Sequence, residues 1–391
     1  MIKSFKVRLK PNNKQITKLF QYAGCARYAY NWALSREFDN SNNGGRFIRE
    51  GELRKEFTDL KKQEDKKWLN DVSNNVAKQA IKDACKNFEC YLNGKCEIPK
   101  FKSRKYSYPS FFQDPCKIRF TDTHVKVEKF TYSRKKNRQN VNWIRLCEKG
   151  RIPTESKYLN PRFTYDGLYW YVSVSIEVED INVVSYNKGI GIDLGVINLA
   201  VCSDGHVYKS INKSRRINII ERREKRLKRS ISRKYEKNKK DDCYNKTENI
   251  KKAEKKILRL KKRVKDKRKD YMYKVISDIV SRRPEYICIE DLDISGMMKN
   301  RRMSKAIQNQ SLYEFRKEII YKANMFNIKI IIADRFFPSS KRCVVCGNIK
   351  KDLRLSDRVY YCKCGNIIDR DLQASLNLML YGRVALSKMK V

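Results

Sequence analysis

The stretch GIGIDLGVINLAVCSDG, residues 189–205, decides the fold. Its apolar runs GIGIDL and NLAVCS predict two short strands joined by a tight turn, and HVYKSI (206–211) predicts a third. Asp193 stands at the end of the first run, and Gly195 allows the chain to leave that strand sharply. A carboxylate at the end of an apolar strand is a first candidate for chemistry.

The segment that follows, residues 213–270, is dominated by charge. Residues 221–270 alone hold 24 Lys or Arg against 9 Asp or Glu. This composition with a thin apolar seam predicts a helical hairpin with a broad basic face. The seam consists of Ile250, Ile257, Leu258, Leu260 and Val264.

The order of the remaining elements gives the fold class. They are the strand EYICIED (285–291), a loop GMMKNRRMSK (296–305), a helix, the strand KIIIADRFF (329–337), a cysteine-rich insert (343–364) and a helix from about Arg370 to Tyr381. Ser311 and Glu314 have the spacing of a capping box for the first of these helices. Its buried side is predicted to hold Leu312, Phe315, Ile319, Ala323 and Phe326. Strand hairpins, helix, strand, helix, strand and helix is the order of the RNase H-like α/β fold.

Three acidic positions fit one metal site in that fold. Asp193 and Glu290 end two strands that are expected to lie parallel and adjacent, and DRDLQ (369–373) supplies a third acid. Asp369 is predicted to be the N-cap of the last helix and Asp371 to face the strand ends. The core-facing residues of this last helix are predicted to be Leu372, Leu376 and Met379. Carboxylates in this arrangement can hold two Mg²⁺ ions about 4 Å apart around a phosphodiester.

Each acid has an ordinary explanation when it is taken alone. An Asp before a glycine often only forms a turn, an acid in a first helical turn favours the helix dipole, and strand-end acids are often simply solvated. Three acids in this topological order on a strongly basic chain favour a catalytic metal site.

Four cysteines predict a second metal site. Cys343-x-x-Cys346 and Cys362-x-Cys364 lie within 22 residues, and a glycine follows each pair. This pattern is typical of a structural zinc ribbon, in which four thiolates leave no open position for water. The second pair has one intervening residue instead of two.

The N-terminal half predicts a different architecture. Residues 2–9 alternate as a strand does, and helical spacing covers Asn13 to about Leu34 and about Gly51 to Leu92, with a turn-rich break at 39–45. Residues 96–180 are strand-like and aromatic, which predicts a small barrel or curled sheet that the N-terminal strand completes.

Composition limits the partners. The net charge of +45 requires a polyanion, and the basic residues are spread over the whole length, which favours nucleic acid. No apolar run of about 18 residues and no signal-peptide core occur, so no membrane partner is expected. The other nine of the 13 cysteines show no framework spacing, as is typical of reduced thiols in a cytosol. With two histidines in the chain, carboxylates must carry the catalysis.

Seven stretches together resemble one family closely, the transposon-encoded TnpB nucleases, which are related to type V CRISPR effectors. They are GCARYAYNWAL (24–34), IPKFKSRKYSYPSFF (98–112), GIDLGVINLAVCSDG (191–205), ICIEDLDISGM (287–297), QSLYEFRKEIIYKA (310–323), SSKRCVVCGN (339–348) and CKCGNIIDRDLQASLNL (362–378). They cover nearly the whole chain in the family's order. Two positions depart from the family pattern: the short second cysteine pair, and Gln373 where Asn is usual.

This resemblance implies a domain plan and the roles of the site residues. The plan is a split RuvC nuclease domain (187–338 and 366–391) with a basic helical insert (213–270) and a zinc ribbon (339–365), preceded by a β-barrel-like wedge domain (1–10 and 95–186) that contains a helical recognition lobe (11–94). Asp193, Glu290 and Asp371 correspond to catalytic acids that bind two Mg²⁺ ions. One structural zinc ion would be bound by Cys343, Cys346, Cys362 and Cys364.

The implied activity is RNA-guided cleavage of double-stranded DNA beside a short flanking motif, in a prokaryotic cytoplasm and on the nucleoid. The partners are a guide RNA from the transposon end and the target DNA. The basic-aromatic stretch 99–108 suits phosphate contacts and base stacking, although lysines also guard solvated strand edges. The residues predicted to make these contacts are Lys100, Lys102, Arg104, Lys105, Tyr106 and Tyr108.

Three alternatives stay open at this level. A miniature type V CRISPR effector has the same chemistry with an array-derived guide, and only the genomic neighbourhood separates the two. A nuclease-silent RNA-guided DNA binder conflicts with the intact acids. A structure-specific nuclease without a guide is compatible with the basic surplus, because any large DNA interface needs cations.

Overall fold

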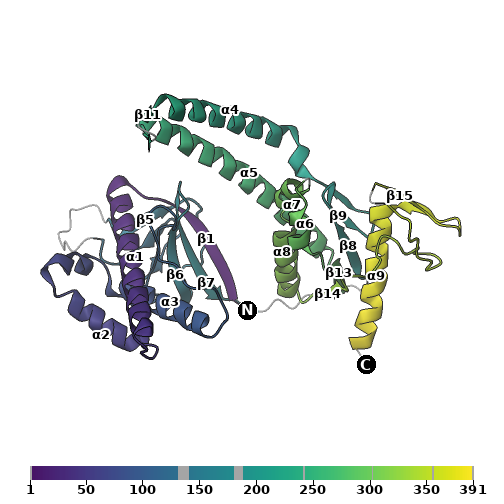
Figure 1. Ribbon diagram of the computed structural model, residues 1–391. Helices are drawn as coiled ribbons and strands as arrows, with labels where there is room; N and C mark the ends of the chain where they lie inside the picture. Colours follow the sequence, from purple (N-terminus) through teal and green to yellow (C-terminus); the bar gives the residue numbers. More distant parts are fainter. Residues whose placement is uncertain are drawn as a thin grey trace. The chain divides into compact units, whose positions relative to one another are not determined.

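The computed structural model describes residues 2–130, 141–179, 188–240, 243–301, 303–354 and 356–389. The chain divides into two compact units, Met1–Glu179 and Asp180–Val391, and each is described by itself (Figure 1). In the described part of the chain, no helix combines the length and the apolar character needed to cross a bilayer.

The first unit is built on a seven-stranded sheet in the order β2-β6-β7-β1-β5-β4-β3, with every neighbouring pair antiparallel. The strands are β1 (Ile2–Lys10), β2 (Ser110–Phe112), β3 (Arg119–Phe120), β4 (His124–Lys126), β5 (Trp143–Leu146), β6 (Tyr158–Tyr165) and β7 (Trp170–Glu177). β1 lies between β7 and β5, so the prediction that the N-terminal strand completes this sheet is confirmed.

The helices of this unit share one core with the sheet. They are α1 (Asn13–Asn42), α2 (Glu50–Leu60), the 3-10 helix η1 (Glu64–Asp71) and α3 (Asn74–Leu92). Tyr22 of α1 packs on Phe111 of β2 with ring centroids 5.2 Å apart, and Phe111 stacks on Phe163 of β6 at 4.9 Å.

The structure refines two sequence predictions for these helices. The helical block expected from about Gly51 to Leu92 is helical but divided into three helices, because the chain turns after Leu60 and again before Asn74, where Leu69 and Val72 are buried. The break expected at 39–45 begins only after Asn42, because the exposed polar side chains there are tolerated in a last helical turn.

The second unit contains a five-stranded sheet in the order β10-β9-β8-β13-β14. The strands are β8 (Ile190–Leu194), β9 (Asn198–Cys202), β10 (Val207–Lys209), β13 (Tyr286–Glu290) and β14 (Lys329–Ala333). β8, β9 and β10 form an antiparallel meander, whereas β13 is parallel to both β8 and β14. This is the strand arrangement that the predicted element order requires.

Helices cover both faces of this sheet (Figure 1). They are α5 (Glu248–Ser281) and α8 (Leu312–Met325) on one face and α9 (Arg370–Met389) on the other. Two short helices, α6 (Ile294–Lys299) and α7 (Ser304–Gln310), extend into both ends of the segment 296–305 that was predicted to be a loop. The predicted capping box is also wrong: α7 runs directly into α8, and Ser311 between them is left-handed (φ 54°) and makes no side-chain cap.

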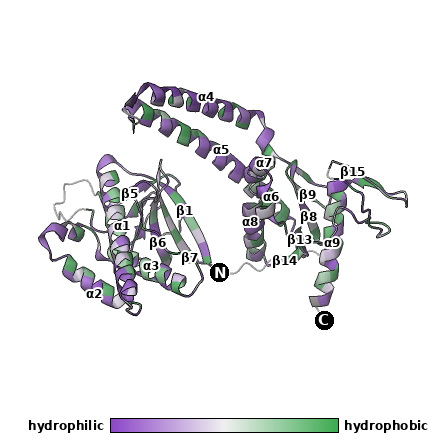
Figure 2. Ribbon diagram, in the orientation of Figure 1, coloured by the Kyte–Doolittle hydropathy of each residue, from purple (hydrophilic) through white to green (hydrophobic). Residues whose placement is uncertain are grey.

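The basic hairpin consists of α4 (Arg215–Lys237) and the N-terminal part of α5, with the short strands β11 (Lys239–Lys240) and β12 (Cys243–Tyr244) at its tip. A short 3-10 helix, η2 (Ile211–Lys213), precedes α4. Small apolar clusters hold the two helices together, and Figure 2 shows both helices as mostly hydrophilic. The predicted seam is correct except for Leu258, which is 42% exposed.

Glycines let α9 lie unusually close to the sheet. A Cβ at Gly191 of β8 would stand 2.0 Å from the backbone oxygen of Ser375 and 2.4 Å from the amide nitrogen of Met379. A Cβ at Gly382 of α9 would stand 2.5 Å from the ring of Tyr286 in β13. The helix backbone therefore lies directly on β8 at Gly191 and on the Tyr286 ring at Gly382, which brings α9 close to this face of the sheet.

Candidate active site

Three carboxylates from separate elements line one open groove of about 850 Å³ in the second unit. β13 pairs parallel with β8, with Ile289 opposite Ile192, so Glu290 and Asp193 follow as neighbours at the same strand ends. Asp371, in the first turn of α9, reaches the groove from the helix that covers this face. The predicted parallel pairing of the two acid-bearing strands is confirmed.

Burial raises the pKa of two of these acids. Burial raises the pKa of Asp193 well above its usual range, and the Glu290 and Asp371 carboxylates raise it further against the opposing charge of Arg370. Burial also raises the pKa of Glu290, although a hydrogen bond from Ser339 and the charge of Arg370 lower it in part. A buried carboxylate that retains its proton releases it when a cation binds. Three carboxylates in an open groove fit hard divalent cations that prefer oxygen ligands, such as Mg²⁺.

Ser339 belongs to this site, although it was not among the predicted site residues. Its hydroxyl donates a hydrogen bond to Glu290 Oε1, and the residue is 6% exposed. The buried Asn377 of α9 donates through Nδ2 to the backbone oxygens of Ser339 (2.7 Å) and Arg342 (2.6 Å). The helix that carries Asp371 therefore also fixes the loop that contacts Glu290. An Asn among the buried positions of a helix is the sequence signal that could have revealed this loop.

The first turn of α9 distinguishes the two acids of the DRD sequence. Asp369 Oδ1 accepts hydrogen bonds from the amides of Asp371 (2.9 Å) and Leu372 (3.0 Å), which is the bonding of an N-cap. Arg370 donates from Nη1 to the backbone oxygen of Arg354 at 2.8 Å and so connects the helix to the cysteine-rich insert. The predicted N-cap role of Asp369 is therefore confirmed.

The predicted core face of α9 was wrong. Leu372, Leu376 and Met379 are only half-buried. The buried residues of the helix include Gln373, Ala374, Ser375, Asn377, Leu378 and Leu386. The close approach at Gly191 admits small and polar side chains at the contact, so hydrophobicity does not mark the face that meets the sheet.

Two further acids border the groove. Asp291 pairs with Arg316 at 2.6 Å and with Arg335 at 2.8 Å, and these hydrogen bonds hold the pKa of its carboxyl below the usual range. Its charge is already balanced, which argues against a role as a metal ligand. Asp334 Oδ1 accepts from the amide of Phe336 at 2.8 Å and closes the turn after β14. Phe336 itself is 88% exposed at the groove.

The four cysteines of the insert lie together, with all four sulfur atoms within 4.8 Å of one another. The strand β15 (Val359–Tyr361) of the insert pairs with β16 (Ile367–Asp369), which follows the insert, in a hairpin that runs directly into α9. Gly347 and Gly365 have φ values of 76° and 88°, and their amides donate to the backbone oxygens of Cys343 and Cys362. The shortened second pair thus forms a tight turn and still brings its sulfur atoms to the cluster, which fits a tetrahedral zinc site.

The surroundings of one of the four sulfur atoms, that of Cys343, favour the thiolate, whereas the amide of Asn366 lowers the pKa of Cys364 but the neighbouring thiols raise it more, to about 12. Burial raises the pKa of the Cys343 thiol, but the amides of Cys346 and Val345 and the side chain of Asn366 lower it more, to about 6. Asn366 Nδ2 donates to Cys343 Sγ at 3.4 Å and to Gln373 Oε1 of α9 at 3.0 Å. Gln373, which departs from the family pattern, therefore connects the thiol cluster to the helix that carries Asp371.

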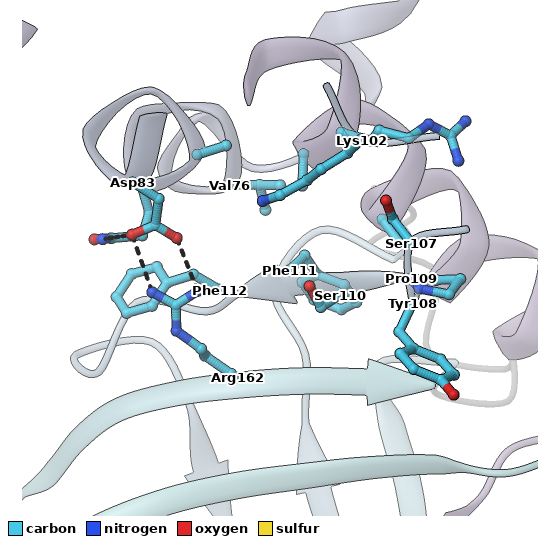
Figure 3. A pocket seen from close by; sticks show the side chains of 15 residues that line it. Val76, Asp83, Lys102, Ser107, Tyr108, Pro109, Ser110, Phe111, Phe112 and Arg162 are labelled. Atoms are coloured by element: carbon cyan, nitrogen blue, oxygen red, sulfur yellow. Dashed lines mark hydrogen bonds and ion pairs between the residues drawn. The ribbon is translucent and has the colours of Figure 1, made fainter. Parts of the chain in front are cut away.

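The basic-aromatic stretch lies in the first unit and borders a small pocket (Figure 3). Asn31 of α1 holds this stretch, because its side chain exchanges two hydrogen bonds of 2.8 Å with the backbone of Lys102. Tyr106 is 80% exposed and Tyr108 is 76% exposed. Lys102 differs from its predicted neighbours: its Nζ lies 3.6 Å from the centroid of the Tyr30 ring, and burial lowers its pKa.

Sequence models of known families match three parts of the chain. One described as a probable transposase matches residues 173–301, which contain Asp193 and Glu290. The Cas12f1-like TNB domain matches 313–378, with the four cysteines and Asp371, and a helix-turn-helix domain matches 1–46. In this structure the last of these segments is β1 followed by the long helix α1.

Relatives align over almost the full length. A putative RNA-guided DNA endonuclease of Streptomyces pristinaespiralis is 28% identical over 98% of this chain and 90% of its own length. The putative RNA-guided DNA endonuclease InsQ of Escherichia coli K12 is 25% identical over 99% of this chain and 94% of its own. These family models and relatives support the assignment of the chain to the TnpB family.

The fold also agrees with a distant relative of the TnpB family. The Cas12f1 chain from a complex with single guide RNA and target DNA superposes with a TM-score of 0.60, at 14% identity, over 97% of this chain and 98% of that one. This likeness concerns the fold alone. The roles of the residues in the groove therefore rest on the geometry of this chain.

Proposed function

We propose that this chain is an RNA-guided endonuclease that hydrolyses phosphodiester bonds of double-stranded DNA in the groove lined by Asp193, Glu290 and Asp371. The observation that carries the proposal is the meeting of these three carboxylates at the ends of two parallel strands and one helix, with the pKa of Asp193 raised by burial and by the other two acids. Relatives described as RNA-guided DNA endonucleases align along the whole chain, which supports guidance and the choice of DNA.

Each group in the groove has a part in this reaction. Two Mg²⁺ ions bound by the three acids supply the positive charge that stabilises the attacking and leaving oxygens. Ser339 orients the Glu290 carboxylate through its hydroxyl. Cationic side chains on the groove wall contact the phosphates of the strand, and the exposed ring of Phe336 offers a surface on which a base can stack. These cationic residues are Arg335, Lys341, Arg358 and Arg370.

The cysteine cluster has a structural part. Its four thiols bind one zinc ion, which holds β15 and β16 in place and, through them, the start of α9. In the domain plan that fits this assignment, residues 187–338 and 366–391 form the nuclease domain around the zinc ribbon at 339–365. Residues 1–10 and 95–186 form the wedge, and residues 11–94 the recognition lobe.

The first unit supplies a nucleic-acid surface in this proposal. Lys100, Arg104 and Lys105 are exposed and contact phosphates, whereas Tyr106 and Tyr108 stack on bases. Lys102 keeps its stretch in position through Asn31 and Tyr30 instead of reaching into solvent. A duplex site needs roughly 6–10 phosphate contacts. These contacts neutralise only a small part of the net charge of +45, and a permanently bound guide RNA offsets the rest.

The decisive experiment is expression with the DNA that flanks the gene at its transposon end. The protein is expected to purify with a discrete RNA and to cut double-stranded DNA only where the 3′ segment of that RNA matches the target and Mg²⁺ is present. Replacing the matching sequence in the target is the control and should abolish cutting. Efficient cleavage by RNA-free protein irrespective of sequence would instead show a nuclease without a guide.

A further inference from the structure

Gln310, the last residue of α7, is buried, and its side-chain amide is fully hydrogen bonded. Nε2 donates to the backbone oxygens of Gly195 and Val196, both at 3.1 Å. Oε1 accepts from Ser210 Oγ at 3.0 Å and from Asn212 Nδ2 at 2.7 Å. Two donors and two lone pairs are the whole capacity of a primary amide, so this side chain has one favoured place and orientation.

The loop that Gln310 holds is part of the candidate active site. Gly195 and Val196 follow Asp193 at the end of β8, and both line the groove. The next carbonyl oxygen, of Ile197, accepts from the amide of Ser210 at 3.2 Å. Three successive carbonyl groups behind the catalytic acid are thus bound by groups from outside the loop, and Gln310 supplies two of these bonds.

The other side of the Gln310 amide leads to the basic hairpin. Asn212 Oδ1 accepts from Arg268 Nε at 2.6 Å, and Arg268 Nη2 contacts Glu221 Oε1 at 3.1 Å. Glu221 belongs to α4 and Arg268 to α5, so this contact joins the two helices of the hairpin. The Arg268 guanidinium can only donate hydrogen bonds, and the backbone oxygens of Gly195 and Val196 can only accept them. The side-chain amides of Asn212 and Gln310 lie between these groups, so each must accept on the Arg268 side and donate on the loop side.

We propose that Gln310 is a positioning residue for the nuclease step, which holds the loop behind Asp193 and connects it through Asn212 and Arg268 to the root of the basic hairpin. The inference rests on the proposed function of the groove. α4 and α5 thereby gain a second role besides their positive charge. The positions of the hairpin root and of the loop behind Asp193 depend on the same series of hydrogen bonds.

The test is Gln310→Glu, with Gln308→Glu as its matched control. The new carboxylate still accepts from Ser210 and Asn212, but it has no N–H groups for the two carbonyl oxygens and repels them. Gln308 is exposed and lies two residues earlier in the same helix, so its variant has the same charge change without the contacts. Groups that orient metal ligands typically contribute about 10–100-fold to activity or metal affinity.

Gln310→Glu is therefore expected to cleave about 10–100-fold more slowly and to bind Mn²⁺ correspondingly more weakly. Guide RNA and target affinity should stay at the wild-type level. The Mn²⁺ affinity is measured by the paramagnetic resonance of free Mn²⁺ on protein without target DNA, so it can be read even if RNA guidance is absent. Gln308→Glu should match the wild type throughout. Wild-type cleavage and Mn²⁺ affinity in Gln310→Glu would overturn the proposal.

A second variant tests the connection to the hairpin and serves if Gln310→Glu does not fold. Arg268→Leu removes the charged donor at the hairpin end of this series of hydrogen bonds. It should weaken Mn²⁺ binding and slow cleavage by a smaller factor than Gln310→Glu does. The double variant should cleave no more slowly than Gln310→Glu alone, because one chain of contacts is interrupted in both. Unchanged Mn²⁺ affinity in Arg268→Leu, or losses that multiply in the double variant, would show that the hairpin root does not act through Gln310.

Discussion

The groove and the cysteine cluster both gather metal-ligating groups, but they are built in different ways. In the groove, the three carboxylates come from β8, β13 and α9, which lie far apart in the sequence, and space for a substrate remains between them. In the cluster, four thiols come from one insert of 22 residues, and backbone amides approach the buried sulfur of Cys343. The groove remains open at its centre, whereas the cluster is closed by its own chain.

This difference separates a catalytic from a structural use of metal. An open group of like charges is costly to fold and becomes favourable only when cations and a substrate arrive. A closed group of thiols with nearby amides is prepared for one ion and leaves no position for a reacting oxygen. The two sites are also connected, because β16, which pairs with β15 of the insert, ends at Asp369, the N-cap of the helix that carries Asp371.

Removal of the acids should have the largest effect. Asp193→Ala, Glu290→Ala and Asp371→Ala are each expected to lower the cleavage rate by at least about 10⁴-fold, the scale of losing one member of a catalytic set. Target binding should change little, because phosphate contacts remain. Asp369→Ala is the control and should cost about 1 kcal/mol of stability for the lost cap while cleavage persists. An inactive Asp369→Ala with an active Asp371→Ala would reverse the assignment of the third acid.

Loss of zinc should have the next largest effect. Elemental analysis is expected to find about one zinc per chain, and Cys343→Ser should release it, because a four-thiolate site needs all its ligands. The melting temperature should fall, and cleavage should drop at least tenfold as the start of α9 loses its support. The exposed Cys243 lies outside the cluster, so Cys243→Ser should keep both the zinc and the activity. Wild-type protein without zinc would contradict the structural role.

Loss of the Ser339 hydroxyl should slow cleavage less than loss of a metal-binding acid does, but more than loss of the neighbouring Ser340 hydroxyl. Ser339→Ala removes the donor to Glu290 and is expected to slow cleavage by about 10–100-fold, with a higher Mg²⁺ concentration at half-maximal rate. Ser340→Ala, at the next position, removes a hydroxyl that does not contact Glu290 and should leave the Mg²⁺ dependence unchanged. Equal effects of the two substitutions on that dependence would mean that the loop as a whole, and not its hydroxyl, supports the acid.

Much of the second unit could be predicted because its signals are local. The apolar runs around Asp193 and Glu290 are strands, the cysteine spacing forms a compact cluster, and the charged segment is a hairpin. The pairing of β8 with β13 could also be anticipated, because the element order allows few topologies.

The contacts that depend on distant segments could not be predicted in the same way. Gly191 lets α9 approach by its backbone, which places Gln373 and Asn377 inside and leaves Leu376 half-buried, against the usual rule that leucines mark the core face. The proposed roles of Ser339 and Gln310 depend on hydrogen-bond partners that lie 49 and 115 residues away along the chain. A hydrogen-bonding side chain carries no periodic signal, so only the folded structure shows these partners.

The smallest effect expected is also the one that most directly tests the charge cluster. The folded protein raises the pKa of Asp193, so between the unfolded value, about 3.9, and the raised folded value it binds more protons than the unfolded chain does. Stability of the Mg²⁺-free protein should therefore fall as the pH rises through that window. Asp193→Asn removes the charge and is expected to melt at a higher temperature than the wild type at pH 7, although it does not cleave.

The charge of Asp291, the residue after Glu290, should have the opposite effect on stability. Its pairs with Arg316 and Arg335 lower its pKa, so its charge stabilises the fold above the unfolded pKa, and Asp291→Asn should lower the melting temperature at pH 7. The gain in Asp193→Asn should shrink at pH 5 and on addition of Mg²⁺, because protons and cations both relieve the same repulsion. A lower melting temperature for Asp193→Asn in Mg²⁺-free buffer would show that the acids of the groove are not under electrostatic strain, and the contrast with Asp291 would fail.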